Sequence, residues 1–431
     1  MDDDRSGWLT KFRSFKGLWR DVAKAFGVSS SFSPDLPADD VERLRQQFHQ
    51  CLEVRGGEMS ARARAAQLGR TYLDLNPIGR MNFLRLLATE FDSDPAAIDG
   101  AMSAVSKATD RAMRLRAERR LKQLLEPPRV KLLTQFTTLP EGVKFLVDMR
   151  AELIALAKSD PVFEGLADDL KSLLASWFDV GFLELKRMTW RSPAMLLEKI
   201  IAYEAVHAIQ GWADLKNRLD SDRRLYAFFH PRMPDEPLIF VEVALVRGLA
   251  GNIQQLLDEH APVQCENEAD TAIFYSINNA QRGLDGISFG NFLIKKVVDD
   301  LSHELPNLKV FATLSPIPGL RGWAERNGLA GQLDHPSEDL LGALAARYLT
   351  EINPDNGRVR DPVAHFHLTN GARLERLNFK ADSSARGLSQ SAGMMVNYLY
   401  KLADIEANNE AYAGQGKVTM SSQVKGLLPK M

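Results

Sequence analysis

The sequence has few cysteines, little net charge and no long hydrophobic run, and each of these absences excludes a class of protein. Its 431 residues include two cysteines, Cys51 and Cys265, which lie far apart in the chain. Such a pair fits neither a disulfide framework nor the ligand spacing of a zinc site, so we expect a reducing, cytoplasmic compartment. The formal net charge is -2. Nucleic-acid and anionic-membrane binders carry a marked excess of basic residues, so we expect small molecules or proteins as partners.

Targeting and membrane segments are also lacking. No apolar stretch approaches the roughly 18 residues that span a membrane. The first residues, MDDDRSGWLTKF, are acidic, whereas a secretory or mitochondrial leader is basic. We therefore expect a soluble protein without a leader.

The first part of the chain has the apolar spacing of helices. Between Asp39 and Phe178, apolar residues recur every three or four positions, and strand-like segments are almost absent. The clearest predicted helices cover residues 41–54, 81–91, 144–158 and 166–178. This pattern predicts an all-helical bundle over residues 1–185, whose amphipathic faces pack on each other or on a second subunit.

The rest of the chain alternates between strand and helix patterns. Residues 225–230 and 236–246 are rich in aromatic and β-branched side chains, and the turn PRMPD separates them, so they predict two paired strands. A strand containing FYSI, a helix over 291–305 and a strand over 308–314 follow. We therefore predict an α+β fold, with a mixed α/β domain over residues 186–431.

A basic run, RAMRLRAERRLKQ, covers residues 111–123 and contains one acidic residue, Glu118. A solvent-exposed helix face, or contact with an acidic partner helix, explains this run better than a nucleic-acid site does.

A loop with three glycines, Gly283, Gly286 and Gly290, lies between a predicted strand and the next helix. Its spacing matches neither the P-loop nor the dinucleotide fingerprint. An ordinary tight connection and a phosphate cradle both fit it, because backbone amides that precede a helix can face an anion. The amides of such a cradle would come from Asp285, Gly286, Ile287, Ser288, Phe289, Gly290 and Asn291.

Two histidines, His365 and His367, precede the pair Asn370-Gly371. Asn-Gly between two alternating runs is typical of a hairpin turn, so we expect both histidines on one face of a strand. The sequence shows no obvious third and fourth metal ligands, and we predict no metal site. The pattern favours one histidine as a proton donor and the other as a core residue.

Ser315 ends a predicted strand and is followed by Pro-x-Pro-Gly. A residue before proline is held in an extended conformation, so the Ser315 hydroxyl has a nearly fixed direction. This order either serves chemistry or simply ends the strand. Further along, Ser389 or Ser391 is expected to cap a helix whose apolar stripe belongs to the core and whose Tyr398 hydroxyl can face a pocket.

Six segments between residues 185 and 402 resemble malonyl-CoA decarboxylases. In chain order they are EKIIAYEAVHAIQGWADLKNRL, HPRMPDEPLIFVEVAL, AIFYSINNAQRGLDGISFGNFLIKKVV, LSPIPG, HFHLTNGA and NYLY. The resemblance implies a helical oligomerisation domain followed by a catalytic domain of the GNAT-like acetyltransferase fold. It also implies a homotetramer that converts malonyl-CoA into acetyl-CoA and carbon dioxide, with coenzyme A as part of the substrate and no separate cofactor.

The resemblance implies roles for single residues as well. The family's catalytic serine and histidine fall on Ser315 and His365, and its serine near the thioester falls on Ser276. Tyr398 belongs to the same neighbourhood, and the loop at residues 285–291 holds the pyrophosphate of coenzyme A. One departure is Ser288, which stands where animal relatives carry a glutamate.

The implied reaction explains why few side chains suffice. Loss of carbon dioxide leaves a thioester enolate, which needs hydrogen-bond donors at its oxygen and a proton at its carbon. We expect Ser315 to hold the malonyl carboxylate or the thioester oxygen, and His365 to supply the proton. An acyltransferase of the same fold is the alternative enzyme, and a non-catalytic CoA-binding scaffold is the alternative of another class. Release of carbon dioxide without an acceptor separates these functions.

Overall fold

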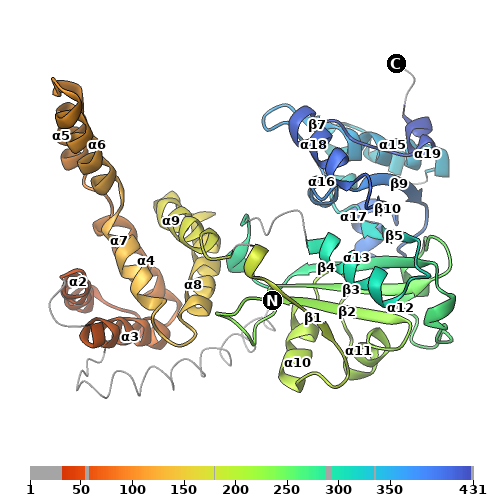
Figure 1. Ribbon diagram of the computed structural model, residues 1–431, viewed down its shortest axis with the longest axis horizontal. Helices are drawn as coiled ribbons and strands as arrows, with labels where there is room; N and C mark the ends of the chain where they lie inside the picture. Colours follow the sequence, from red (N-terminus) through yellow and green to blue (C-terminus); the bar gives the residue numbers. More distant parts are fainter. Residues whose placement is uncertain (1–31, 54–57, 179, 288–292, 334–335, 429–431) are drawn as a thin grey trace. The chain divides into compact units, whose positions relative to one another are not determined.

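The structure of the protein is a computed structural model that describes residues 32–53, 58–178, 180–287, 293–333 and 336–428 (Figure 1). The chain divides into two compact units. Unit 1 comprises Met1–Phe178 and Gln281–Ser288, and unit 2 comprises Asp179–Ala280 and Phe289–Met431. The sequence pattern places the boundary near residue 185, and the segment 281–288 joins the helical unit although strands flank it in the chain.

Unit 1 is helical throughout its described residues. Several helices begin at residues with the expected capping chemistry: the side chains of Asn76, Asp94 and Asp110 accept hydrogen bonds from the first turns. The predicted helices are confirmed. The helices are α2 (Ala38–Leu52), α3 (Glu58–Asp74), α4 (Pro77–Glu90), α5 (Pro95–Lys107), α6 (Arg111–Leu125), α7 (Pro128–Phe136), α8 (Gly142–Ala157) and α9 (Glu164–Ala175), with the 3-10 turns η1 (Pro161–Phe163) and η4 (Arg282–Leu284).

Aromatic side chains form the centre of the core of unit 1. The ring of Phe48 meets those of Phe83 and Phe91 edge to face, with 5.1 Å between ring centroids in both pairs. Tyr72 makes edge contacts of the same kind with Phe83 and Phe145. Pairs in this geometry contribute about 0.5–1.5 kcal/mol each beyond the burial of their area, so these rings fix how α2, α3, α4 and α8 pack.

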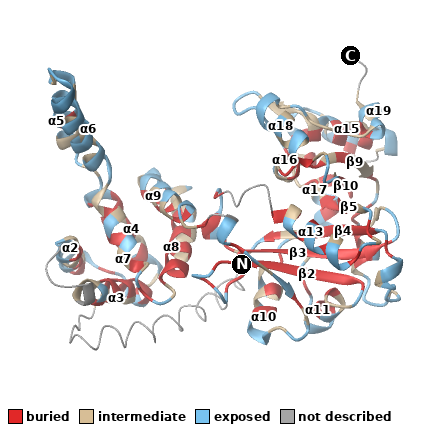
Figure 2. Ribbon diagram, viewed as in Figure 1, coloured by how far each residue is buried: buried red, intermediate tan, exposed pale blue. Residues whose placement is uncertain are grey.

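Helices α5 and α6 pack on each other and bury little else (Figure 2). None of the residues of α6 is buried, and Met113 and Leu115 are among its exposed side chains. The basic run at residues 111–123 therefore lies on an exposed helix of this chain, as the sequence predicts.

Unit 2 is built on one mixed sheet with the strand order β1-β2-β3-β4-β5-β10-β6, and β9 pairs with β10. All neighbouring strands are antiparallel except β4 and β5, which are parallel. The strands are β1 (Glu184–Met188), β2 (Arg223–Phe229), β3 (Ile239–Val246), β4 (Thr271–Asn279), β5 (Val310–Thr313), β6 (Ser315–Pro316), β9 (Arg373–Asn378) and β10 (Met395–Tyr400). The short strands β7 (Ile352–Asn353) and β8 (Arg358–Val359) form a separate pair.

Helices cover both faces of this sheet. Every residue of β2 and β3 is buried (Figure 2). On one face, Leu197 and Ile200 of α10 join a core with Leu225 of β2, and on the other the Tyr226 hydroxyl donates to Asp300 of α13 over 2.7 Å. The helices of unit 2 are α10 (Ala194–Tyr203), α11 (Trp212–Arg218), α12 (Ile253–Leu257), α13 (Leu293–Glu304), α14 (Leu320–Arg326), α15 (Glu338–Thr350), α16 (Pro362–Thr369), α17 (Ala385–Ser391), α18 (Ile405–Gln415) and α19 (Ser422–Leu427), and the 3-10 turns are η2 (Val180–Phe182), η3 (Glu266–Glu268) and η5 (Ala330–Leu333).

The predicted architecture is confirmed: a helical unit is followed in the chain by an α/β domain built on a mixed sheet. The strand pair at residues 225–246 and the helix at 291–305 are found as β2, β3 and α13. No helix in the described part of the chain is both long and apolar enough to cross a membrane.

Two local predictions are wrong. The segment with Met394 and Tyr398 is strand β10 rather than a helix, because Ala392 and Gly393, both at positive φ, end α17 and the next residues pair with β5, β6 and β9. The segment with His365 and His367 is helix α16 rather than one strand of a hairpin. Asn370 ends α16 and Gly371, at φ 79°, follows it as the left-handed residue that often closes a helix.

Candidate active site

Ser315 is the first residue of β6, and one residue separates it from the end of β5. The amide of Leu314 donates to the carbonyl of Phe274 in β4 over 3.0 Å, and Ser315 pairs with Val396 of β10. The residue before Pro316 is thus held extended between two neighbouring strands, as the sequence predicts. Ser315 is only 6% exposed, so its hydroxyl faces protein groups.

The hydroxyl of Ser315 belongs to a chain of four hydrogen-bonding side chains. Ser315 Oγ lies 2.8 Å from Thr313 Oγ1 and 3.1 Å from His367 Nε2. The other ring nitrogen, His367 Nδ1, lies 2.7 Å from the hydroxyl of Tyr400. Thr313 Oγ1 also accepts the backbone N–H of Tyr398 over 3.1 Å. The chain therefore runs Thr313, Ser315, His367, Tyr400.

The two tautomers of neutral His367 give this chain two opposite directions. With the proton on Nε2, His367 donates to Ser315, Ser315 donates to Thr313, and Nδ1 accepts the proton of Tyr400. With the proton on Nδ1, each of these three hydrogen bonds reverses, and all partners remain satisfied. Such a chain can move a proton toward or away from Ser315 without placing a net charge on any member.

The surroundings keep His367 neutral. Burial lowers the pKa of the imidazole to about 3. The ring of Tyr398 stacks on it at 4.4 Å between centroids and 25° between planes. The hydroxyl of Tyr398 is buried and has no hydrogen-bond partner among the described residues. It is a donor available for another molecule, beside the imidazole and two positions along β10 from Tyr400.

Helix α16 decides which histidine meets Ser315. Asp361 accepts the amide of Ala364 at its N-terminus over 2.8 Å, and Pro362 occupies the first helical position. Successive side chains of a helix turn by about 100°, so residues two apart point to nearly opposite sides. His367 faces Ser315, whereas His365 Nδ1 lies 2.8 Å from the hydroxyl of Tyr412.

The structure thus brings together Ser315, Tyr398 and His367, and it does not join Ser315 to His365 in any described contact. Thr313 and Tyr400 were not singled out from the sequence. Tyr400 stands two residues from Tyr398 on β10, and Thr313, the last residue of β5, stands two residues before Ser315, the first of β6. In an extended chain this spacing puts side chains on one face.

Ser276 belongs to a second buried polar cluster in unit 2. Its hydroxyl donates to Glu204 Oε2 over 2.8 Å, and Asn278 Nδ2 donates to the same oxygen over 2.6 Å. Nearby, Arg218 makes ion pairs with Glu242 at 2.9 Å and with Asp214 at 2.7 Å. Burial, aided by the charge of Glu204, raises the pKa of Glu242 to about 8. No described contact joins Ser276 to Ser315.

The predicted phosphate loop is described only in its first part. Asp285, Gly286 and Ile287 follow η4, and Gly286 has φ 74°, a conformation that favours glycine. Ser288, Phe289, Gly290 and Asn291 lie outside the described residues.

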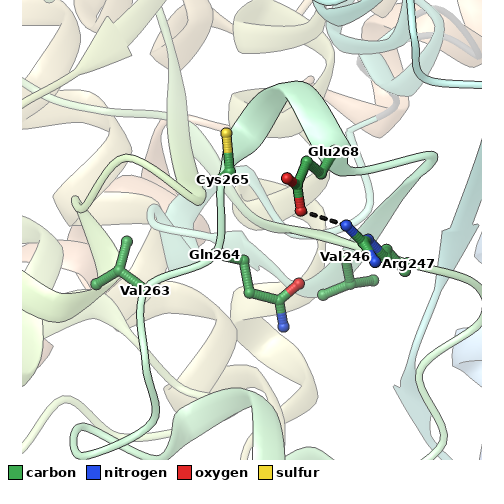
Figure 3. A pocket seen from close by; sticks show the side chains of 6 residues that line it. All are labelled: Val246, Arg247, Val263, Gln264, Cys265 and Glu268. Atoms are coloured by element: carbon green, nitrogen blue, oxygen red, sulfur yellow. Dashed lines mark hydrogen bonds and ion pairs between the residues drawn. The ribbon is translucent and has the colours of Figure 1, made fainter.

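A surface pocket of about 470 Å³ lies elsewhere in unit 2 (Figure 3). Its lining contains none of the predicted site residues: it consists of Val246, Arg247, Val263, Gln264, Cys265 and Glu268. Val246 pairs with Thr271 of β4, which pairs with Val310 at the beginning of β5, whereas Ser315 follows the end of β5. The pocket therefore lies at the opposite end of these strands from Ser315. Among the described residues, no three His, Cys, Asp or Glu side chains gather as they would around a metal ion.

Comparison with known proteins gives the same family for both units. The profile of the malonyl-CoA decarboxylase C-terminal domain matches residues 181–335 and 331–431, and that of the N-terminal domain matches residues 91–178. The mitochondrial malonyl-CoA decarboxylase of Anser anser anser is 35% identical over 422 residues, covering 84% of this chain and 83% of that protein. The mitochondrial enzyme of Mus musculus is 36% identical over 403 residues, covering 81% and 82%.

Solved structures of malonyl-CoA decarboxylases are also similar to this chain. The crystal structure of malonyl-CoA decarboxylase from Rhodopseudomonas palustris matches with a TM-score of 0.84 and 42% identity, over 90% of this chain and 99% of that one. The crystal structure of the enzyme from Agrobacterium vitis matches with a TM-score of 0.82 and 44% identity, over 90% and 100%. This chain belongs to the malonyl-CoA decarboxylase family.

Proposed function

We propose that the protein converts malonyl-CoA into acetyl-CoA and carbon dioxide, with Ser315 and His367 as its catalytic residues. The observation that carries the assignment is the 3.1 Å contact between Ser315 Oγ and His367 Nε2 in a buried, uncharged setting. The resemblance in sequence points to His365 for the proton-transfer role. His365 faces Tyr412 on the other side of α16, so we assign that role to His367.

These side chains must provide a hydrogen bond to the enolate oxygen and a proton for the enolate carbon. When the bond to the carboxylate breaks, its electron pair forms the enolate of the thioester and carbon dioxide departs. The hydroxyl of Ser315 donates to the enolate oxygen, and we assign to His367 Nε2–H the proton that converts the enolate carbon into a methyl group. One proton is taken up from solvent per turnover, and the hydroxyl of Tyr400 donates to Nδ1 as Nε2 gives up its proton. Exclusion of water favours loss of the charged carboxylate.

The first test measures carbon dioxide and acetyl-CoA released from malonyl-CoA by the purified protein, with a chelator and no acyl acceptor. We expect equimolar products. Loss of an oxyanion donor or of an acid-base group typically lowers kcat by about 10²–10⁴, so Ser315→Ala and His367→Ala should lose activity by this order. His365→Ala is the matched control, from the same helix, and should stay within a few fold of the parent.

Three results would contradict the proposal in different ways. If the folded parent binds coenzyme A but releases no carbon dioxide, the protein is not a decarboxylase, and an acyltransferase or a non-catalytic CoA-binding scaffold becomes the better explanation. Loss of activity in His365→Ala with a retained rate in His367→Ala would return the role to His365. Chelator-sensitive turnover would contradict the assignment of a reaction without metal.

The same family resemblance leads us to propose a homotetramer in the cytoplasm that uses no cofactor beyond the coenzyme A of its substrate. The exposed apolar side chains of α6, Met113 and Leu115, and the two free cysteines support it. Sedimentation equilibrium of the full chain gives the subunit number, and a monomer would contradict the first part.

A further inference from the structure

The carboxyl group of Asp361 lies at the start of the helix that carries His367. Asp361 is fully buried, at 0% exposure, and its Oδ1 accepts the amide of Ala364 over 2.8 Å. An acceptor at this position fixes the first turn of a helix. Helix α16 has only 8 residues, so its first turn also decides where the imidazole of His367 lies.

The same carboxyl group meets the turn that follows Ser315. Burial raises the pKa of Asp361 to about 6, and hydrogen bonds to the carboxylate, among them those from the Tyr348 hydroxyl and the Gly319 amide, oppose this rise. Gly319 is the last residue of the sequence Ser-Pro-Ile-Pro-Gly, which begins at Ser315. Asp361 thus joins the two segments of unit 2 that carry Ser315 and His367.

Tyr348 of α15 completes this contact. Its hydroxyl donates to the Asp361 carboxylate, and a Cβ atom on Gly319 would lie 2.0 Å from the hydroxyl oxygen. Tyr348 is 3% exposed, and its ring lies beside that of Trp323 with 5.5 Å between centroids. The hydroxyl therefore has little room to move, and only glycine lets the backbone of the turn approach it this closely.

The turn itself is stiff. Pro316 and Pro318 have a fixed φ, and Ile317 between them is fully buried. Few dihedral angles remain that could absorb a displacement of Gly319. A shift of Gly319 against α16 is therefore transmitted to Ser315.

We propose that Asp361 and Tyr348 are positioning residues for the decarboxylation, because they hold the turn after Ser315 against the first turn of α16. These contacts set the distance between Ser315 Oγ and His367 Nε2. At 3.1 Å this distance is near the long end of the range for a hydrogen bond, so a small shift of either segment weakens the bond. The inference rests on the proposed function and adds two residues that act through its catalytic pair.

Two substitutions of Asp361 test the role of its acceptor oxygens. Asparagine caps a helix as well as aspartate does, and its oxygen has two lone pairs for two amides, so Asp361→Asn should keep kcat within a few fold of the parent. Asp361→Ala removes these acceptors. It should lower kcat roughly tenfold to a hundredfold, as misplaced reacting groups do, and leave KM for malonyl-CoA unchanged.

Ser421→Ala is the matched control for the loss of a helix cap. Ser421 Oγ accepts the amide of Val424 over 3.2 Å at the start of α19. Thermal unfolding measures the loss of stability in both alanine variants, and kcat is compared at a temperature at which all variants are folded. Ser421→Ala should be destabilised and keep the parent kcat.

A double-mutant cycle tests the contact between the turn and α15. Gly319→Ala should lower kcat about tenfold or more, because its Cβ atom pushes the turn away from the Tyr348 hydroxyl. In the Tyr348→Phe background that oxygen is gone, and the nearest ring atom, Cζ, lies 3.0 Å from the Cβ position. The same substitution should then lower kcat several fold less. Equal losses of kcat in both backgrounds would overturn the role of Tyr348.

Nitrogen NMR of isotope-labelled histidine keeps the positioning role separate from catalysis. The Nε2 signal of His367 is the one lost in His367→Ala, and removal of its partner in Ser315→Ala should shift it. Asp361→Ala should shift it in the same direction, and Asp361→Asn should not. If the parent releases no carbon dioxide but shows this pattern, the proposed function fails and the positioning role stands. If the parent turns over and Asp361→Ala changes neither the signal nor kcat, only the positioning role is wrong.

Discussion

The two buried polar clusters of unit 2 differ in charge, although both contain a serine from the central strands. The cluster around Ser315 holds three hydroxyls and one imidazole, each able to donate and accept. The cluster around Ser276 contains the carboxyl groups of Glu204, Glu242 and Asp214 and the guanidinium of Arg218. A neutral chain can reverse its direction at little cost, whereas opposite charges in a dry interior fix one arrangement. The first cluster is therefore suited to moving a proton, and the second to fixing the structure.

The largest expected effect on stability comes from breaking the charged cluster. Arg218→Met leaves Asp214 buried without its cation and the Glu242 carboxyl without its donor, and removal of one partner of a buried pair costs about 3–5 kcal/mol of the free energy of unfolding. Arg247→Met is the control, since its pair with Glu268 is 67% and 60% exposed and should be worth under about 1 kcal/mol. Urea unfolding measures both. Equal stability of the two variants would contradict the structural role of the Arg218 cluster.

The second prediction is that Glu242 and His367, one from each cluster, change the free energy of unfolding with pH in opposite directions. The pKa of Glu242 is raised to about 8, so its folded form retains a proton that the unfolded chain releases. The free energy of unfolding should therefore fall as pH rises from about 4.5 toward 8, by at most about 1.4 kcal/mol per pH unit. Glu242→Gln should flatten this part of the profile. A slope unchanged in the variant would assign it to other groups.

His367 acts in the opposite direction. Its pKa is lowered to about 3, so the unfolded chain binds a proton that the folded one does not. Its contribution to stability is complete above about pH 6.5 and is lost as pH falls toward 3.

The smallest effect distinguishes two neighbouring hydroxyls of the neutral cluster. Tyr400→Phe removes the partner of His367 Nδ1 and should lower kcat about fivefold to tenfold, the effect of one hydrogen bond. Tyr398→Phe removes a hydroxyl without a described partner and should leave stability unchanged. Steady-state kinetics with thermal unfolding checks the pair. A larger loss of kcat in Tyr398→Phe would mean that its hydroxyl, rather than that of Tyr400, serves the reaction.

The sequence predicts the helices of unit 1 and the strands β2 to β5 because each has one clear pattern: amphipathic spacing, or a short run of β-branched and aromatic residues. The sequence does not predict strand β10. This strand is buried on both faces, so apolar residues occupy nearly every position and the alternation typical of a strand is missing. Pairing with three other strands decides its conformation.

The site could be predicted in part. Ser315 is recognisable from Ser-Pro at the end of a strand, and Tyr398 from its place in NYLY. The choice between His365 and His367 depends on whether DPVAHFHL is a strand or a helix, and Asp-Pro at its start is a helix signal that Asn370-Gly371 at its end obscures. No local pattern joins Thr313 and Tyr400 to the hydrogen bonds of Ser315 and His367, because the order of the strands does so.

The assignment of residues 281–288 to the helical unit has a consequence for the order of synthesis. The guanidinium of Arg150 in α8 donates to the backbone carbonyls of Gly283 and Asp285. When residue 178 leaves the ribosome, neither of these two residues has been synthesised. They follow about a hundred residues later, a delay of about 5–20 seconds at ordinary rates of translation. Until then the guanidinium of Arg150 lacks two of its hydrogen-bond acceptors. Unit 1 is therefore completed only after residues 281–288, which lie between two segments of unit 2 in the chain, have been synthesised.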